Sequence, residues 1–318
     1  MVRSVQKSRF PLSRRAAILG LGAAVLMGTP VFAQETIKVG LVAALSGQSA
    51  KSGEAITRGL EVAIDEINAA GGVLGKKIEL VRRDDESNPA KGVVAARELV
   101  QKEKVAAFFG GIDTPVSLAI VPFANQAKVP FIGVWAAGTA ITRNGAPENY
   151  VFRVSAVDEL VDEAMIDYGV KTYKTAKPGL MLINNPWGES NEKGLKAAAA
   201  AKGLAVAGAE KFDNADVDMV PQLTRLKEAG ADTIFLVANV QPAAQVVKSL
   251  DRMGWAVPVV SHWGPAGGRF TELGGPSAEK VHMVQTYSKP FSPDNQDALG
   301  KADYMFTHFK GAEIVPVN

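Results

Sequence analysis

The sequence contains no cysteine, and its three histidines, His262, His282 and His308, lie far apart along the chain. The first absence excludes disulfides and thiolate metal sites, and the second predicts no histidine metal cluster, so we expect neither a metal nor a cofactor. Beyond residue 33 no apolar run approaches the roughly 20 residues that cross a membrane. Low-complexity tracts and long runs of one charge are also missing. What remains is the composition of a globular protein, 318 residues long and 47% hydrophobic, with enough chain for two cores.

The first 33 residues have the composition of a secretory signal peptide. Met1–Arg15 contains five basic residues and no acid, and the apolar stretch Ala16–Gly28 follows it. Small residues then precede the cleavage site that we expect directly after Ala33. A membrane anchor is the alternative, but about 13 apolar residues cannot span a bilayer core of about 30 Å. The Arg14–Arg15 pair also resembles a twin-arginine signal, so that route and the general secretory route both stay open.

The predicted signal peptide, residues 1–33, also determines the sign of the net charge. Without its five basic residues the net charge changes from +2 to −3, so the remaining chain is slightly acidic. The basic excess of the whole sequence therefore gives no reason to expect nucleic acid as a partner. We predict a soluble protein that is exported to the periplasm.

From Thr36 onwards, short apolar strands alternate with amphipathic helices. We predict strands at 37–43, 77–83, 105–110, 129–134, 179–184, 204–212, 233–238 and 257–261, and the first seven of these are each followed by a predicted helix. Successive strand–helix units require parallel sheets with right-handed crossovers, and the pattern pauses around 146–154. The predicted fold class is therefore α/β, with two doubly wound parallel-sheet lobes joined by a hinge. A (β/α)₈ barrel is the alternative, which fits less well because of that pause and because no eighth unit is visible.

In open parallel sheets, ligands bind beyond the carboxyl ends of the strands. Three of the loops predicted there contain a tryptophan, namely Trp135, Trp187 and Trp263. Packing under its own loop is the alternative for each ring, but three rings at equivalent positions favour a shared pocket wall.

Two of these loops are suited to bind a carboxylate. Thr114-Pro115 and residues 136–139 offer backbone N–H groups and hydroxyls near predicted helix N-termini, where the helix dipole favours anions. Helix capping by Thr114 and Thr139 is the alternative interpretation, and both can hold because the neighbouring amides stay available. The predicted ligand is therefore a small molecule with a carboxylate.

The motifs of enzymes are missing or misplaced. Gly20–Gly22 resembles the start of a dinucleotide fingerprint but lies in the leader, and Walker, HExxH and GxSxG motifs do not occur. Asp84–Asp85 and the pair Asp216 and Asp218 are typical of solvated loops or helix caps. His262 follows a predicted strand but has no nucleophile beside it, so polar contact or packing is its expected role. We predict no catalytic residues and no enzyme.

With these loops in view, the chain from Ile37 to at least Tyr287 resembles the leucine/isoleucine/valine-binding family of type I periplasmic solute-binding proteins. The resemblance is carried by Lys38–Gly40, Leu45–Gly47, Gly59–Asn68, Ala69–Gly75, Asp84–Asp85, Asn88–Pro89, Pro130–Gly133 and Trp187–Gly188. It implies two lobes joined by a three-strand hinge, which close on a solute and present it to the transmembrane subunits of an ABC permease. It also implies that residues 36–148 and 291–318 form the N-terminal lobe and residues 149–290 the C-terminal lobe.

The resemblance also assigns a ligand site. Thr114 matches a hydroxyl that helps to hold the polar head of the ligand, and residues 135–137 match the carboxylate-binding loop. Trp187 takes the place of a pocket tyrosine, and Val240 or Gln241 matches the next aromatic position. The expected ligand-binding residues are Ser52, Thr114, Trp135, Ala136, Ala137, Trp187, Val240 and Trp263.

Three departures from the family accompany this resemblance. The acid that pairs with the ligand ammonium would fall near Trp263, where no acid stands, so an amino acid would need another acceptor, for which Asp113 is the candidate. Some members of the family carry a disulfide whose two positions correspond to Ser87 and Asp113 in this sequence, so both of its cysteines are absent here. The family also continues beyond the helix that we predict at Asn295–Lys310, so the sequence looks truncated, with a second hinge crossing near 288–291.

Three functions are compatible with these residues. The first is capture of a solute by hinge closure, where an amino acid and an aromatic or other organic acid without an ammonium group both remain open. The second is a sensory ligand-binding module, which would need a fused membrane or effector segment. The third is an exported hydrolase, which would turn over its ligand. We expect a binding protein that acts as a monomer.

Overall fold

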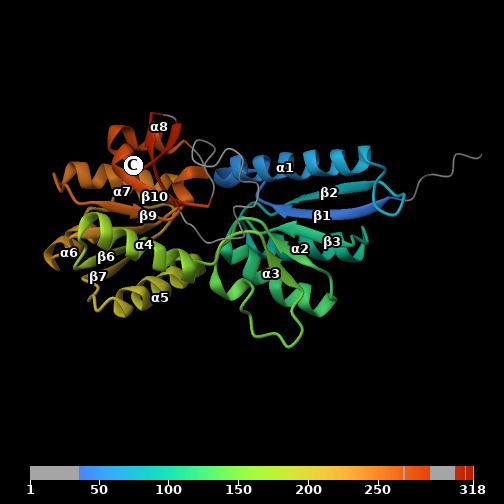
Figure 1. Ribbon diagram of the computed structural model, residues 1–318, viewed down its shortest axis with the longest axis horizontal. Coiled ribbons are helices and arrows are strands. Elements are labelled where there is room, and N and C mark those ends of the chain that lie inside the picture. The colour runs from blue at the N-terminus through green and yellow to red at the C-terminus, as the bar shows by residue number, and fades with distance from the viewer. Residues whose placement is uncertain (1–35, 268, 287–304, 312, 318) are drawn as a thin grey trace, which may run out of the picture.

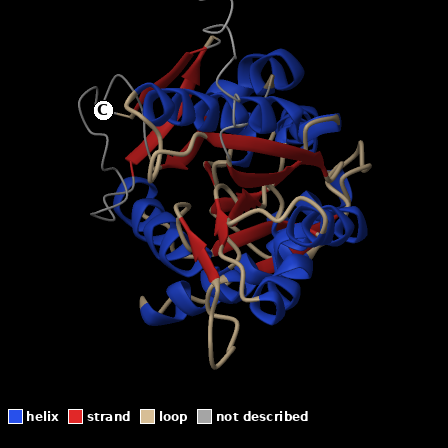
Figure 2. Ribbon diagram, turned by 90° about the vertical axis from the view of Figure 1, so that its right-hand side faces the viewer, coloured by secondary structure: helices blue, strands red, loops and turns tan. Residues whose placement is uncertain are grey.

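The computed structural model describes residues 36–267, 269–286, 305–311 and 313–317. They form two lobes that lie side by side along the longest axis of the molecule (Figure 1). In the view along that axis, strands lie in the middle and helices surround them (Figure 2). The predicted leader and its cleavage site lie outside the described residues.

The first lobe is built on a five-stranded parallel sheet of order β2-β1-β3-β4-β5. Its strands are β1 Ile37–Ala43, β2 Ile78–Asp84, β3 Ala107–Gly110, β4 Phe131–Gly133 and β5 Val151–Arg153. Its helices are α1 Ala50–Ala69, α2 Pro89–Gln101 and α3 Thr114–Ala127, with the short 3₁₀ helices η1 Gly47–Ser49 and η2 Thr139–Ile141. The Asn88 side chain accepts hydrogen bonds from the N–H groups of Ala90 and Lys91 and so caps α2, as the sequence indicates.

The second lobe contains a seven-stranded sheet of order β12-β11-β10-β9-β8-β6-β7. Its strands are β6 Pro178–Ile183, β7 Gly208–Phe212, β8 Thr233–Val237, β9 Val259–Ser261, β10 Val281–Gln285, β11 Met305–Lys310 and β12 Glu313–Pro316. Its helices are α4 Asp158–Tyr173, α5 Pro186–Ala201, α6 Val220–Glu228, α7 Val240–Arg252 and α8 Phe270–Gly274, with η3 Gly264–Gly267 and η4 Gly275–Lys280. Strands β6 and β8 are buried along their whole length, as expected for a sheet that is covered on both faces.

The parallel strands of both lobes follow the same order, with the second strand outside the first and the later three on the other side. The direction of the connections therefore reverses between β1 and β3, and again between β6 and β8. Such switch points are where open α/β sheets bind ligands. The predicted doubly wound architecture is confirmed, and two open sheets replace the alternative of a closed barrel.

The end of the chain differs from the prediction. Residues 305–310, expected to end a helix, form strand β11, which runs antiparallel to β10 and β12. Thr307 and Phe309 are buried whereas Phe306 and His308 are partly exposed, which is the period of a strand rather than of a helix. Gly311 makes the tight turn to β12 with a φ of +61°. The first part of the predicted helix, 295–304, and the second hinge crossing lie outside the described residues.

The lobe boundaries also differ from those expected. Residues 305–310 and 313–316, expected in the first lobe, belong to the sheet of the second lobe because β11 pairs with β10 and with β12. Residues 151–153, expected in the second lobe, form the edge strand β5 of the first sheet because they pair with β4. The chain therefore leaves the first lobe after Arg153 and enters the second at Asp158, the first residue of α4.

Each lobe has its own aromatic core. In the first lobe, Phe108 and Phe131 stack with their ring centroids 5.0 Å apart. In the second, Phe212, Phe235 and Phe270 are among the largest fully buried side chains. Among the described residues, no helix has the length and apolarity needed to cross a bilayer.

Two neighbouring acids at the end of β2 have opposite pKa shifts. Asp85 is 1% exposed, and burial raises its pKa from 3.8 to about 6, with Asp113 and Asp84 acting in the same direction. Burial also raises the pKa of Asp84, but hydrogen bonds from Ser46, Glu86 and Leu45 together outweigh it and leave that pKa lowered.

We predict that Asp85→Asn stabilises the protein at neutral pH. Ionisation of the buried carboxyl lowers the stability of the fold progressively from about pH 4 to pH 6, and the amide removes this loss while its oxygen still accepts the Ser87 N–H. The free energy of unfolding in urea should rise by about 1–3 kcal/mol at pH 7.5 and be unchanged near pH 4. Asp84→Asn is the control, because a lowered pKa predicts destabilisation at pH 7.5. Equal effects of the two substitutions at pH 7.5 would contradict this assignment.

Candidate functional site

A cavity of about 270 Å³ lies between the two lobes. This volume is close to the lower end of the range of about 300–1,000 Å³ that is typical of small-molecule sites. Its walls come from loops at the carboxyl ends of strands in both sheets, including residues 112–115 and 135–137 of the first lobe and 239–241 and 263–264 of the second. All eight residues expected from the sequence line this cavity: Ser52, Thr114, Trp135, Ala136, Ala137, Trp187, Val240 and Trp263. Gln241 and Asp113, the two further candidates, also lie there. That these residues bind a ligand stays a prediction.

Three indole rings form the apolar part of the wall. Trp135 of the first lobe meets Trp263 of the second edge to face, with ring centroids 6.4 Å apart and an interplanar angle of 77°. Trp187 and Trp263 are only 9% and 7% exposed. The shared pocket wall predicted from the strand ends is therefore present in the geometry, and one of its ring contacts joins the two lobes.

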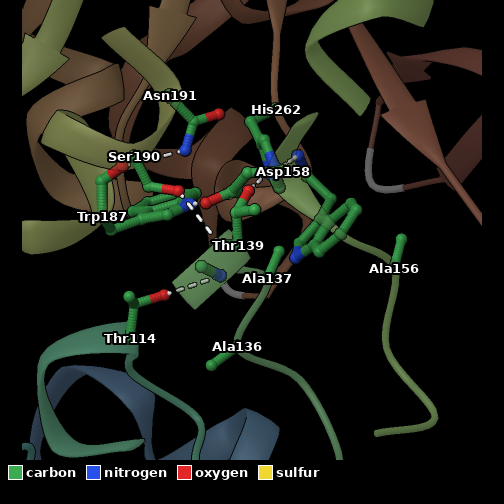
Figure 3. Close-up of polar contacts among 12 residues, drawn as sticks. Thr114, Ala136, Ala137, Thr139, Ala156, Asp158, Trp187, Ser190, Asn191 and His262 are labelled. Atoms are coloured by element: carbon green, nitrogen blue, oxygen red, sulfur yellow. Dashed lines mark hydrogen bonds and ion pairs between the residues drawn. The ribbon is translucent and has the colours of Figure 1, made fainter. Parts of the chain in front are cut away.

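The carboxylate-binding loop offers fewer free amides than the sequence suggests. The N–H groups of Ala136, Gly138 and Thr139 already donate to Gly111 O, Thr114 Oγ1 and Ser190 Oγ, at 2.9, 3.3 and 3.1 Å (Figure 3). Among the described residues, the N–H groups of Ala137 and Thr114 have no hydrogen-bond acceptor. The Thr114 donor lies at the start of the 14-residue helix α3, the Ala137 donor lies in the loop after β4, and both are available to an anion.

The two threonine hydroxyls act differently from simple caps. Asp113, not Thr114, is the N-cap residue of α3, and Thr114 Oγ1 instead accepts the Gly138 N–H, which leaves its own hydroxyl proton free to donate. Thr139 Oγ1 accepts the N–H of Glu159, in the first turn of α4, at 3.2 Å. Together with the Ser190 contact, Thr139 thus joins the first lobe to two helices of the second.

Arg153 holds the loop that follows β4 by hydrogen bonds to its backbone, a role that the sequence did not reveal. Its guanidinium donates to the carbonyl oxygens of Ala137, Gly138 and Ala156 at 2.7–3.0 Å. Burial lowers the pKa of Arg153, while the charge of Asp158 raises it. The guanidinium stays protonated at neutral pH because the pKa of arginine lies above about 12. A fixed positive charge therefore lies next to the loop that contributes Trp135, Ala136 and Ala137 to the cavity wall.

The second lobe contains a buried acid that the sequence also failed to reveal. Asp158 is fully buried, and its Oδ1 accepts Trp187 Nε1–H at 3.3 Å and His262 Nε2–H at 3.2 Å (Figure 3). His262 is also fully buried, with its ring 4.0 Å from that of Trp263. The expectation that His262 makes polar and packing contacts is confirmed.

Charged groups at the cavity wall are mostly cationic. Lys51 and Arg269 line it, whereas Asp113 is the one acid among its described lining residues. Burial raises the pKa of Asp113, and the adjacent Ser87 hydroxyl offsets only part of this effect. Ser87 and Asp113 are thus neighbours, as the resemblance implies. The cavity is better suited to an anion than to a cation.

The N-terminus of α5 places Trp187. Asn185 Oδ1 caps this helix by accepting the N–H groups of Trp187 and Gly188, and Pro186 occupies the first turn. A Cβ atom at Gly188 would stand 1.8 Å from Ile183 O, so only glycine lets the helix start this close to β6.

We predict that Gly188→Ala destabilises the protein by about 3 kcal/mol or more, because the backbone that holds Trp187 must shift. Gly59→Ala is the matched control: it lies inside α1, nothing lies within 4 Å of the added Cβ, and alanine favours helices by about 1 kcal/mol. Urea unfolding should show the first variant well below the wild type and the second at or above it. Similar stabilities for the two variants would show that Gly188 is not constrained in this way.

Two α/β lobes with a small-molecule cavity at the carboxyl ends of both sheets define a two-lobed binding protein. The chain belongs to the periplasmic binding protein family, whose model matches residues 36–310. The fold class and the family resemblance expected from the sequence are thereby confirmed.

Curated relatives of this chain carry names from the leucine/isoleucine/valine-binding group. It is 26% identical to Leu/Ile/Val-binding protein homolog 3 of Brucella melitensis over 276 residues, which cover 87% of this chain and 74% of that protein. It is 30% identical to Leu/Ile/Val-binding protein homolog 7 of Brucella suis over 224 residues, which cover 69% of this chain and 56% of that protein. The chain thus spans roughly one half to three quarters of the length of these relatives.

Solved structures with the same fold bind different ligands. A substrate-binding protein of a branched-chain amino acid transporter from Streptococcus pneumoniae, in complex with isoleucine, matches with a TM-score of 0.71 and 27% identity, covering 80% of this chain and 72% of that one. A solute-binding protein of an ABC transporter from Rhodopseudomonas palustris, in complex with p-hydroxybenzoic acid, matches with a TM-score of 0.70 and 27% identity, covering 80% and 68%.

Proposed function

We propose that this chain is the solute-binding subunit of an ABC importer, which captures a small carboxylate and delivers it to the transmembrane subunits of a permease. The observation that carries the proposal is the cavity, whose walls come from both lobes. A ligand shifts an open–closed equilibrium only through contacts that exist in the closed state, and a cavity shared by two hinged lobes provides them. The family and the two relatives solved with ligands support this function.

The carboxylate head of the ligand would bind at the first lobe. The N–H groups of Thr114 and Ala137 and the Thr114 hydroxyl are its donors, with Arg153 supplying a nearby positive charge. Hydrogen bonds to a charged group contribute about 1.5–3 kcal/mol each. Two or three of them, with stacking on an indole, reach the roughly 8 kcal/mol of micromolar affinity.

The ligand class that fits this cavity best is an aromatic carboxylate without an ammonium group. Three indoles line the apolar part, and the one acid on the described wall, Asp113, has a pKa that burial raises. A buried ammonium without an ionised partner costs several kcal/mol. An amino acid is the second candidate, because Asp113 lies at the wall and a relative binds isoleucine.

The remaining parts of the proposal concern the cellular context. Residues 1–33 would act as a signal peptide and direct the protein to the periplasm by the general secretory or the twin-arginine route. The protein would work as a monomer and return its ligand chemically unchanged. Mass spectrometry of the ligand after incubation would detect the altered product that an enzyme must release.

We predict that acids without the ammonium group bind more tightly than the matched amino acids. The pairs 3-phenylpropanoate and phenylalanine, and 4-methylpentanoate and leucine, differ only in the α-ammonium. Isothermal titration calorimetry should give Kd values at least 10-fold lower for the first member of each pair, and benzoates should also bind. Tighter binding of the amino acids would overturn the ligand class, and binding of no carboxylate at all would overturn the function.

We also predict that Trp187→Ala weakens binding of the preferred acid at least 10-fold, because it removes an aromatic wall of the second lobe. Trp255→Ala is the matched control, because Trp255 contacts Lys227 and does not line the cavity. Calorimetry on both variants, with circular dichroism to confirm folding, provides the comparison. Unchanged affinity in a folded Trp187→Ala protein would exclude the contact across the lobes.

A further inference from the structure

The buried polar groups beneath the cavity form a connected set on the second lobe. Asp158 begins α4, and its backbone N–H donates to Ala137 O at 2.8 Å, which ties the start of this helix to the carboxylate-binding loop of the first lobe. The carboxyl group of the same residue accepts both Trp187 Nε1–H and His262 Nε2–H. One residue is thus bonded to the carboxylate-binding loop through its backbone and to an aromatic wall through its side chain.

The contacts of His262 determine which of its ring nitrogens carries the proton. His262 Nδ1 accepts the backbone N–H of Trp263 at 3.0 Å, so Nδ1 carries no proton and Nε2 donates to Asp158. The His262 ring also lies edge to face against Trp187, with centroids 5.0 Å apart. The orientation of Trp263 therefore depends on His262, and that of His262 depends on Asp158.

A second acid one helical turn away completes the set. Asp162 is fully buried, and neither of its carboxyl oxygens has a partner among the described residues; the same holds for Asp158 Oδ2. Gly194 of α5 packs so closely that a Cβ there would stand 2.0 Å from Asp162 Oδ2. Burial raises the pKa of Asp162 well above its ordinary value, and the charge of Asp158 adds to this shift. Two adjacent buried carboxyls do not both ionise.

We propose that Asp158 is a positioning residue of the ligand site: its carboxyl group orients Trp187 directly and Trp263 through His262. This inference rests on the proposed function, because the two tryptophans matter as walls of a ligand cavity. Asp158 does not itself touch the ligand, since it is fully buried and does not line the cavity. Arg153 is the nearby cation, and the charge of Asp158 raises its pKa.

The first test compares Asp158→Asn with Asp162→Asn. Both substitutions keep the size of the side chain. Only the first changes the carboxyl group that accepts hydrogen bonds from the Trp187 indole and the His262 imidazole. Asp158→Asn should lose the near-ultraviolet circular dichroism bands of tryptophan in the ligand-free protein, while its far-ultraviolet spectrum is unchanged. It should also bind the preferred carboxylate at least 10-fold more weakly and change the affinity ratio between benzoate and 4-hydroxybenzoate.

Asp162→Asn should change neither the tryptophan bands nor the affinity by more than about twofold, because neither oxygen of Asp162 accepts an N–H group of the tryptophans or of His262. A folded Asp158→Asn protein with normal tryptophan bands and a normal affinity ratio would overturn the proposal. A loss of thermal stability alone, without either spectral or selectivity change, would also overturn it, since that is the effect of a purely structural residue.

A measurement on the unmodified protein keeps the test decisive where Asp158→Asn does not fold. Nitrogen-15 NMR should show His262 protonated at Nε2 and not at Nδ1, and slow exchange of the Trp187 indole proton compared with that of the partly exposed Trp255. The opposite tautomer, or fast exchange at Trp187, would overturn the proposal. These spectra require no ligand, so they decide the role of Asp158 even if no carboxylate binds. A failure of every carboxylate to bind would refute the proposed function alone.

Discussion

Arg153 is the last residue of β5, and its guanidinium donates three hydrogen bonds to carbonyl oxygens on either side of the point where the chain leaves the first lobe. Two of these acceptors, Ala137 and Gly138, belong to the loop that follows β4 and lines the cavity, and the third, Ala156, belongs to the connection to the second lobe. The peptide units of the loop are polarised in one sense because their carbonyls point at a cation. The Arg153 guanidinium therefore holds both the connection between the lobes and the loop that follows β4.

The same guanidinium explains why buried charges collect where the lobes meet. A guanidinium that is withdrawn from water needs a carboxylate nearby, and Asp158 supplies it from the first residue of α4. Burial and the charge of Asp158 both raise the pKa of the second acid, Asp162, well above its ordinary value. The aromatic walls of the cavity therefore rest on the buried carboxyl group of Asp158, which is hydrogen-bonded to Trp187 and His262.

The sequence predicted the architecture and the location of the cavity because both follow from local periodicity. Parallel strands place their carboxyl ends at one edge of a sheet, so loops 114–115 and 135–139, and Trp187 and Trp263, had to face one region. The β11–β12 hairpin was missed because a segment as short as Met305–Lys310, with apolar and polar residues mixed, suits a helix or a strand equally well. Arg153 and Asp158 were missed because their partners are backbone carbonyls and side chains far along the chain, which no local pattern reveals.

The contact between Trp135 and Trp263 joins one ring from each lobe, so it belongs to the closed arrangement of the lobes. Edge-to-face pairs of this kind contribute about 0.5–1.5 kcal/mol, and 1 kcal/mol multiplies the closed fraction of an empty protein about fivefold. In an importer of the proposed kind, some empty carriers would then adopt the shape that a permease recognises. Those empty carriers would compete with loaded ones for docking to the permease. The strength of a single ring contact would then set the fraction of docking events that deliver no ligand.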